Sequence, residues 1–252
     1  RYKPSGVDWL GDVPEHWGVI PLKRIAWFKS GAGFPVSSQG KNNLELPFFR
    51  VSDMNVLGND VYMENHTSTV TKEEAKKLGA FIFPEATIIF PKVGGALLTN
   101  KRRILTQPSC IDNNIMGCVP YACYGDFLFT LLSIIDLGKI CKPGPVPAIS
   151  EGEVRQIMAA FPPIAEQKII ADKAKFEARK IQNIISLIMR EITLIREFRT
   201  RLIADVVTGK VDVREAAKNL PEEPEEEIAP MDEEAEPEET AEVSEDKEAA
   251  VE

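Results

Sequence analysis

The densest group of basic side chains in residues 1–161 begins with Lys92. It continues, after the glycine pair Gly94–Gly95, with the run Thr-Asn-Lys-Arg-Arg at residues 99–103. Arginine can bind a phosphate or the O6/N7 edge of guanine through two hydrogen bonds, asparagine matches adenine, and lysine supplies positive charge to phosphates. This segment and two further polar stretches contain the candidate nucleic-acid contacts, which are Lys92, Thr99, Asn100, Lys101, Arg102, Arg103, Arg50 and Lys41.

A solvated charge run is the competing interpretation of this segment. Residues 1–161 contain 17 basic and 15 acidic side chains, so their net charge is only +2. A nucleic-acid-binding domain usually carries a larger basic excess. Taken alone, the cluster supports nucleic-acid binding weakly, and both interpretations stay open at this point.

Side chains suited to catalysis or metal binding are scarce. The sequence has no GxxxxGK[ST] phosphate loop, no GxSxG nucleophile turn and no HExxH metal motif. The four cysteines form no CxxC pair, and the two histidines, His16 and His66, lie far from them in the sequence. We therefore expect no catalytic residues, no metal ligands and no cofactor bound to this chain.

Two patterns bear on where the protein works. No apolar run approaches the ~18 residues that a membrane-spanning helix needs, and the longest candidate, residues 127–135, contains Thr130 and Ser133. The chain does not open with a signal-peptide pattern, and its cysteines fit reduced thiols. These patterns favour a cytoplasmic protein.

The net charge of −9 is distributed unevenly along the chain. Residues 219–252 hold 16 acidic side chains and one basic one, whereas residues 1–218 hold 23 acidic and 29 basic side chains. The C-terminal stretch also has four prolines and no aromatic residue. Such a segment cannot bury enough apolar surface to offset its ordering entropy, so we expect a disordered acidic tail from about residue 219.

A long helix is the clearest secondary-structure signal. After Pro162–Pro163 no glycine or proline occurs until Gly209, so a helix of roughly 40 residues and ~60 Å is expected between residues 163 and 207. Apolar residues recur at every seventh position, with a second interleaved set that is interrupted at Arg199, which is the pattern of a coiled-coil seam. Its large aliphatic members are Ile181, Ile185, Ile188, Ile192, Ile195, Leu202 and Val206.

We expect the aliphatic side chains of this seam to be buried against another surface. Burial of its seven aliphatic side chains is worth a gross total of roughly 10–20 kcal/mol. No second helix of comparable length is expected in residues 1–165, so the seam packs along its own domain or against a helix of another chain. Because a ~60 Å helix is longer than a domain of this size can cover, we favour an intermolecular partner and assign the seam to dimerisation.

Residues 1–160 are expected to form an α+β domain, because strand and helix patterns alternate without a regular βαβ rhythm. Thr71 is a candidate helix cap, with Glu74 three residues later. Helices are expected at residues 22–28, 71–78 and 124–135, and strands at residues 47–52, 86–90, 95–98, 111–119 and 153–161.

Three longer motifs stand out. Residues 5–17 read SGVDWLGDVPEHW, residues 161–170 read FPPIAEQKII, and residues 207–214 read VTGKVDVR. They resemble, in the same order and spacing, the opening of a target recognition domain, the entry to the conserved spacer helix and the end of that helix. All three belong to the specificity subunits of type I restriction–modification systems.

The resemblance implies a non-catalytic subunit that reads double-stranded DNA within a complex of site-specific endonuclease and DNA adenine methyltransferase activity. In that family, recognition domains bind the two halves of a bipartite target. The spacer helices form an antiparallel coiled coil that docks the methyltransferase (modification) subunits. S-adenosylmethionine, ATP and Mg would belong to partner subunits, including the restriction/translocase subunit. The implied domains are residues 1–162 for recognition, 163–209 for the spacer helix and 210–252 for a C-terminal segment.

Copy number is the main departure from the family. A full specificity subunit carries two recognition domains and two spacer helices, whereas this sequence contains one of each. We expect a half-subunit that dimerises, with a fragment as the alternative. Two other functions stay open: a scaffold or DNA-mimicking regulator that uses its acidic tail without binding DNA, and a recognition domain separated from a methyltransferase that acts in trans.

Overall fold

The computed structural model describes residues 1–141 and 144–218. The chain divides into two compact units, residues 1–186 and 187–252, and the boundary between them lies inside one long helix. The acidic tail expected from about residue 219 lies outside the described residues. Within the described ranges, no helix is long and apolar enough to cross a membrane.

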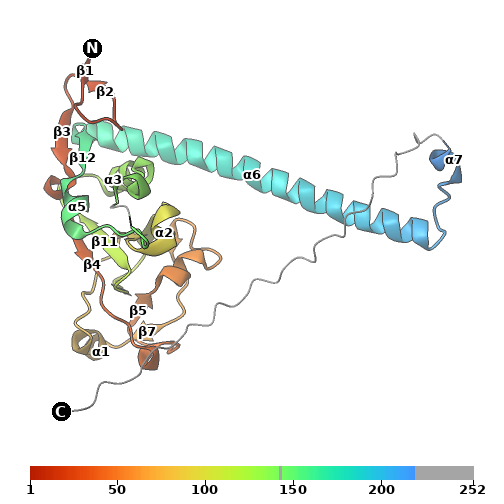
Figure 1. Ribbon diagram of the computed structural model, residues 1–252, viewed down its shortest axis with the longest axis horizontal. Helices are drawn as coiled ribbons and strands as arrows, with labels where there is room; N and C mark the ends of the chain where they lie inside the picture. The colour runs from red at the N-terminus through yellow and green to blue at the C-terminus, as the bar shows by residue number, and fades with distance from the viewer. Residues whose placement is uncertain (142–143, 219–252) are drawn as a thin grey trace. The chain divides into compact units, whose positions relative to one another are not determined.

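A five-stranded sheet forms the centre of the first unit (Figure 1). Its first four strands are mutually antiparallel, and its last strand runs parallel to its neighbour. In spatial order the strands are β4 (Ala26–Ser30), β11 (Ile115–Pro120), β8 (Ile88–Pro91), β9 (Arg103–Leu105) and β6 (Tyr62–Met63).

Three smaller sheets accompany the central one. A three-stranded sheet consists of β10 (Cys110–Ile111), β5 (Leu46–Phe49) and β7 (Thr69–Val70), in that order. The two strand pairs are β1 (Tyr2–Pro4) with β2 (Asp12–Pro14), and β3 (Gly18–Pro21) with β12 (Met158–Phe161).

The helices range from single turns to one of 44 residues. The α-helices are α1 (Lys72–Lys77), α2 (Gly94–Leu98), α3 (Gly125–Ile134), α4 (Leu137–Ile140), α5 (Glu151–Gln156), α6 (Ile164–Val207) and α7 (Arg214–Ala217). The 3-10 helices are η1 (Leu22–Arg24), η2 (Val36–Ser38) and η3 (Val51–Asn55).

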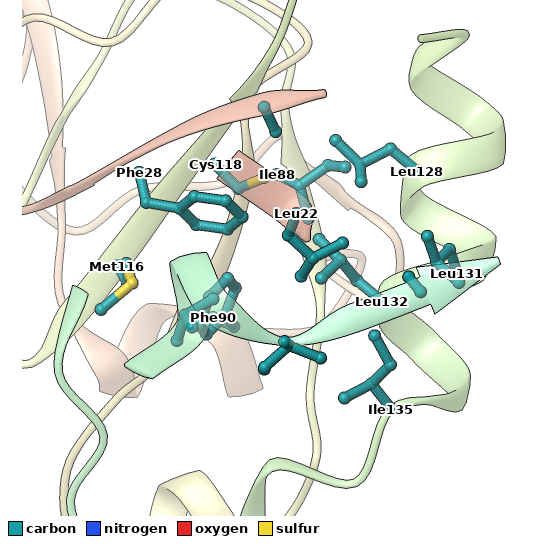
Figure 2. Close-up of a cluster of buried hydrophobic side chains, with 14 of the residues drawn as sticks. Leu22, Phe28, Ile88, Phe90, Met116, Cys118, Leu128, Leu131, Leu132 and Ile135 are labelled. Carbon is teal, nitrogen blue, oxygen red and sulfur yellow. The ribbon is translucent and has the colours of Figure 1, made fainter. Parts of the chain in front are cut away.

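The largest core cluster lies between α3 and one face of the central sheet (Figure 2). Alternate residues of β8 and β11 point toward this face, because successive side chains of a strand lie on opposite sides of a sheet. The strands contribute Ile88, Phe90, Met116 and Cys118, and the helix contributes Phe127, Leu128, Leu131 and Leu132 at the spacing of one helical stripe.

A second cluster covers the opposite face of the same strands. Ile89 and Ile115 pack there with Phe83 and the residues around β5 and η3. A Cβ atom on Gly117 of β11 would lie 2.3 Å from the Phe83 ring, so only glycine allows this ring to pack on the sheet. Burial on both faces explains why β8 is apolar at every position instead of alternating.

Several expected elements are confirmed. The Thr71 hydroxyl accepts a hydrogen bond from the Glu74 amide, 3.1 Å away, and caps α1 as expected. The helix expected at residues 124–135 is α3, and the strand expected at residues 86–90 is β8 with a small shift. The long helix is confirmed as α6, and Gly209 follows it in the left-handed conformation, at φ +73°.

Five predicted elements were wrong, wholly or in part. Residues 47–52 pass from β5 into η3, and residues 112–114 lie between β10 and β11 within the strand expected at 111–119. Residues 22–28 form η1 and then β4, because pairing with β11 outweighs local helical preference. Residues 95–98 belong to the helix α2, since a short apolar run does not distinguish a strand from a buried helical turn. Residues 153–161 begin as α5, where Ser150 and Glu153 form a capping box, and only 158–161 form a strand.

Candidate nucleic-acid interface and helical seam

The basic segment at residues 99–103 divides into inward and outward side chains. Arg102 is only 4% exposed. Its guanidinium donates hydrogen bonds to the carbonyl oxygens of Lys101 and Ile135, at 2.9 and 3.2 Å, and to Asn100 Oδ1 at 2.8 Å. It also lies 5.0 Å from the centroid of the Phe90 ring. Burial lowers the pKa of the Arg102 guanidinium to about 10.

Asn100 supports this buried arginine. The residue adopts a left-handed conformation, at φ +54°, which asparagine tolerates better than most side chains. Its Oδ1 atom accepts hydrogen bonds from Arg102 and from the Leu137 amide, the latter at 3.4 Å. The candidate contacts Arg102 and Asn100 thus make hydrogen bonds inside the fold, which the charge pattern alone did not reveal.

Lys101 and Arg103 point to the other side, where they meet the end of η3. Lys101 Nζ donates to Asn55 Oδ1, and Arg103 Nη2 donates to the Met54 carbonyl oxygen at 3.2 Å. Partial burial lowers the pKa of Arg103. A cavity of about 340 Å³ opens beside them, lined by Met54, Asn55, Val56, Leu57, Asp60, Lys101 and Arg103. Asn55, Leu57 and Asp60 were not among the sequence candidates.

Arg50 lies at the other end of the same short helix. As the residue before η3, it donates through its guanidinium to Gln39 Oε1 at 2.6 Å and to Thr67 Oγ1 at 3.2 Å. A five-residue 3-10 helix rises by about 2 Å per residue, so its two ends lie about 10 Å apart. We call the region formed by Arg50, Asn55, Lys101 and Arg103 the η3 surface.

Lys41 extends this region through the loop that carries Gln39. Lys41 Nζ pairs with Glu74 Oε1 at 2.9 Å, and the Ser38 hydroxyl donates to the same oxygen at 2.9 Å. The hydrogen bonds from Lys41 and Ser38 hold the pKa of the Glu74 carboxyl below its ordinary value. Lys41 is therefore a cation whose charge is partly compensated, and its neighbour Glu74 is fixed in the ionised form.

The other two candidates lie on separate parts of the first unit. Lys92 Nζ donates to the Ser30 hydroxyl at 3.0 Å, so this cation sits beside the end of β4. Thr99 is exposed at the end of α2, and its hydroxyl donates back to the Ala96 carbonyl oxygen at 2.7 Å. The structure brings Lys101, Arg103 and Arg50 together through η3, and it does not place Lys92 or Thr99 in that group.

The described residues contain no group of three or more His, Cys, Asp or Glu side chains placed to hold a metal ion. Burial raises the pKa of the Cys110 thiol to about 11 and that of Cys123 to about 12. Both thiols are therefore protonated at neutral pH, a form that is a poor nucleophile.

The first two long motifs meet in space at the start of α6. Glu166 accepts a hydrogen bond from the Trp17 indole at 2.8 Å, and its other oxygen lies 2.7 Å from His16 Nε2. The neighbouring Gln167 is fully buried, donates to the Pro162 carbonyl oxygen and accepts from the Tyr124 amide. The Glu-Gln pair therefore fixes the first turn of the helix to the N-terminal segment and to the start of α3.

Farther along α6, the aliphatic seam is open to solvent in the described chain. The six members Ile181, Ile185, Ile188, Ile192, Ile195 and Leu202 are between 37% and 59% exposed, and Val206 is partly buried. Single exposed aliphatic residues are common, but a row of six along one stripe of a helix is typical of a surface that binds another protein.

A second apolar stripe runs along the same helix. Ile184, Leu187, Leu194 and Phe198 are each between 56% and 67% exposed. At 100° per residue this stripe lies about a quarter of a turn from the seam. These four residues lie outside the heptad seam predicted from the sequence, although Leu187 and Leu194 are also separated by seven residues. The helix therefore presents two apolar faces, which is the pattern of a helix that joins a bundle.

The early turns of α6 also line an apolar groove in the first unit. Its volume is about 480 Å³, and its walls include Tyr62 and Ile104 from the sheet, Phe129 from α3, and the small residues Ala174 and Ala178 from α6. An ion pair between Lys175 and Asp126, at 3.3 Å, lies at its margin. Ala174 and Ala178 occupy the two positions that precede Ile181 in the heptad seam, so the groove continues the seam.

Comparison with known proteins adds independent observations. No family model matches the chain. The type I restriction enzyme MjaVIII specificity subunit of Methanocaldococcus jannaschii is 22% identical over 215 residues, which is 81% of this chain and 48% of that protein. The putative MjaX specificity subunit of the same organism is 24% identical over 216 residues, which is 81% of this chain and 46% of that protein. This chain thus spans about half the length of both relatives.

Solved structures show the same similarity in fold. The HsdS subunit from Thermoanaerobacter tengcongensis matches 72% of this chain and 41% of its own, with a TM-score of 0.53 and 16% identity. A chain from a structural study of complex assembly and conformational transition of the type I R-M system matches 76% of this chain and 45% of its own, with a TM-score of 0.57 and 16% identity.

This chain resembles the type I restriction specificity subunits. The resemblance expected from the three long motifs is confirmed in sequence and in fold. The contacts of His16, Trp17, Glu166 and Gln167 now give two of those motifs a physical role, because they join the recognition domain expected at residues 1–162 to the helix that follows it.

Proposed function

We propose that this chain is the sequence-reading, non-catalytic specificity subunit of a type I restriction–modification complex. The observation that carries the proposal is the combination of a mixed α/β unit similar in fold to such subunits with a long helix whose aliphatic stripes have no partner in the described chain. In this role the chain works in the cytoplasm and binds double-stranded DNA.

The η3 surface is the part of the first unit best suited to bind DNA. Lys101 and Arg103 lie beside a cavity large enough to admit polar groups, and Arg50 lies at the other end of the same short helix. Cations of this kind bind phosphates and guanine edges. We propose Lys101, Arg103, Arg50 and Lys41 as contacts at this surface, with Lys92 and Thr99 as further contacts on separate parts of the first unit.

The exposed seam supports pairing of two copies. Two helices bring together twelve of the large aliphatic side chains described above, each roughly half exposed. Covering that remaining surface is worth about 9–18 kcal/mol, which compares with a cost of association of about 4–15 kcal/mol. A dimer of this kind would read two half-sites related by a twofold axis, at a separation set by the helix.

The second apolar stripe offers a place for the methyltransferase subunits. Ile184, Leu187, Leu194 and Phe198 would stay exposed after the seam is covered, because they lie about a quarter of a turn away. A partner helix could complete a bundle there. S-adenosylmethionine would then be bound by the modification subunit, and ATP and Mg would serve the restriction/translocase subunit.

Selection of DNA sequences tests the proposal directly. The full chain, alone and together with its modification subunit, is incubated with random duplex DNA, and bound DNA is sequenced after several rounds. We expect an inverted repeat of two half-sites with a fixed spacer, and affinity that falls steeply with salt because phosphate contacts release counterions. Equal binding of all sequences would refute the proposal.

Two variants refine this experiment. Lys101→Met and Arg103→Met should each weaken binding, and a cation that contacts a phosphate should reduce the slope of log affinity against log salt by about 1. Lys77→Met is the matched control, since Lys77 is an exposed lysine on α1 with no assigned contact to DNA. A control variant that weakens binding as much as the other two would remove the η3 surface from the interface.

A further inference from the structure

The turn that follows η3 presents a leucine to solvent. The Asn59 amide donates to the Val56 carbonyl oxygen at 3.0 Å and closes a four-residue turn with Leu57 and Gly58 at its centre. Gly58 has φ +91°, a conformation that glycine adopts readily at this position of a turn. The Leu57 side chain is 93% exposed, the highest value among the large apolar side chains in the described chain.

Hydrogen bonds of the Asn59 and Asn65 side chains hold this turn in place. Asn59 is fully buried, and its side-chain amide donates to the carbonyl oxygens of Asp53 and Asn65, at 2.8 and 2.7 Å. Its Oδ1 atom accepts from the amides of Glu64 and Asn65. The Asn65 side chain in turn donates to the Leu57 carbonyl oxygen at 3.0 Å. The hydrogen-bonding capacity of Asn59 is fully used.

The rigidity of the turn lowers the entropy cost of binding through Leu57. A flexible loop must be ordered when it binds, and the lost entropy weakens binding, whereas a preformed turn avoids this cost. Leu57 also forms part of the wall of the 340 Å³ cavity that Lys101 and Arg103 line. An apolar tip and two cations thus share one site on a braced scaffold.

We propose that Leu57 is a wedge that enters the target DNA between two neighbouring base pairs, while Lys101 and Arg103 hold the flanking phosphates. The proposal rests on the DNA-reading function proposed above. Apolar side chains inserted in this way partly unstack the base step and kink the duplex. Because pyrimidine–purine steps unstack most easily, a TA, CA or TG step should occur at the wedge position in each half-site.

The experiment uses the full chain and the duplex enriched by the selection described above. The fluorescent adenine analogue 2-aminopurine, whose emission rises on unstacking, replaces one adenine at a time on either strand of a half-site. We expect the wild-type chain to raise the emission at one step. Leu57→Ala should abolish that rise and lower the affinity about tenfold. Val36→Ala is the matched control, because Val36 is 83% exposed elsewhere in the first unit, and it should behave as wild type.

Three other outcomes would overturn the wedge. Leu57→Ala could bind with wild-type affinity and keep the emission rise, in which case DNA reading stands and the wedge alone fails. Wild type and Leu57→Ala could differ in affinity for DNA that contains thymine but bind equally to DNA in which uracil replaces thymine. Leu57 would then be a contact to a thymine methyl group. If the wild-type chain enriches no DNA sequence, the proposed function fails and the wedge fails with it. Thermal melting checks that each variant is folded.

Discussion

At the scale of single residues, Arg102 shows that a basic side chain in a charge run can serve the fold. Its half-buried neighbours Lys101 and Arg103 contact the end of η3, whereas its own guanidinium binds Asn100 and two carbonyl oxygens and lies over the Phe90 ring. A buried cation is tolerated only where hydrogen bonds replace its water. Arg102 therefore anchors the segment that carries Lys101 and Arg103.

Replacement of Arg102 should destabilise the protein more than replacement of its neighbour. Arg102→Met removes the guanidinium donor from the Ile135 carbonyl oxygen and one of the two donors from Asn100 Oδ1, so we expect a loss of about 1–3 kcal/mol in the free energy of unfolding. Lys101→Met changes an outward side chain and should cost no more than ~0.5 kcal/mol. Urea unfolding followed by circular dichroism measures both, and equal effects would contradict the anchoring role.

Glu166 is the second residue whose role emerges from contacts. Hydrogen bonds from Trp17 and from His16 hold the pKa of the Glu166 carboxyl below its ordinary value of 4.5. A carboxyl whose pKa is lowered by folding adds stability above the pKa of the unfolded chain. That contribution is lost as the pH falls through the lower pKa of the folded state.

The Glu166→Gln variant tests this contribution. We expect wild type to be more stable than the variant at neutral pH, and the difference in the free energy of unfolding to shrink below pH 4.5. Urea unfolding at a series of pH values, followed by tryptophan fluorescence, measures the difference. Glu85→Gln, at an exposed carboxylate, is the control and should show no such trend. A difference that does not vary with pH would mean that the charge of Glu166 is unimportant.

At the scale of elements, α6 carries two apolar faces and one polar face. The residues at consecutive positions 186, 187 and 188 belong to the polar face, the second stripe and the seam, and residues 193, 194 and 195 repeat this order one heptad later. Each face thus has one pair of residues seven positions apart: 186 and 193, 187 and 194, or 188 and 195. Replacing both members of one pair by aspartate adds the same charge to each face in turn.

The seam pair should control dimerisation. Ile188→Asp with Ile195→Asp places two charges in the proposed dimer interface, where burial of unpaired carboxylates is prohibitive, so we expect a monomer. Ser186→Asp with Thr193→Asp adds the same charges on the polar face and should leave the dimer intact. Light scattering coupled to size-exclusion chromatography measures the mass. A dimer that persists in the seam variant would refute the assignment.

The second stripe should control assembly with the modification subunit. Leu187→Asp with Leu194→Asp leaves the seam unchanged, so the chain should still dimerise. We expect this variant to lose co-purification with the modification subunit, because its exposed leucines would no longer offer an apolar face. Normal assembly of the variant would show that the methyltransferase docks elsewhere.

At the scale of the whole molecule, the charge distribution separates the DNA-reading function from its alternative. Residues 219–252 hold 16 acidic side chains against one basic side chain, and residues 1–218 carry a basic excess. An acidic strip can compete with DNA for a basic surface, which is the basis of the DNA-mimicking hypothesis. A DNA reader does not require such a strip for its contacts to phosphates.

Removal of residues 219–252 distinguishes the two functions. If the chain reads DNA, the truncated protein should bind the selected target with affinity within about twofold of wild type. If the chain acts as a DNA mimic, the truncation should abolish its activity toward the restriction complex. Fluorescence anisotropy with labelled duplex, at one fixed salt concentration, provides the first measurement, and a methylation assay of the complex provides the second.

The sequence by itself determined the features that depend on local pattern. Heptad spacing and the absence of glycine and proline predicted α6, and the Thr71 cap and the long apolar run predicted α1 and α3. Three motifs predicted the resemblance to specificity subunits. Each of these signals lies within one continuous segment, so neighbouring residues alone carry the physical cause.

Only the tertiary structure decided which polar side chains face solvent. Arg102 and Lys101 are adjacent in the sequence, and their fates differ because Phe90 and Ile135 come from distant segments to enclose one of them. The bracing of Leu57 by Asn59 and the meeting of Trp17 with Glu166 likewise join residues that local pattern does not connect. Burial depends on the packing of remote segments, and a short window of sequence does not contain that information.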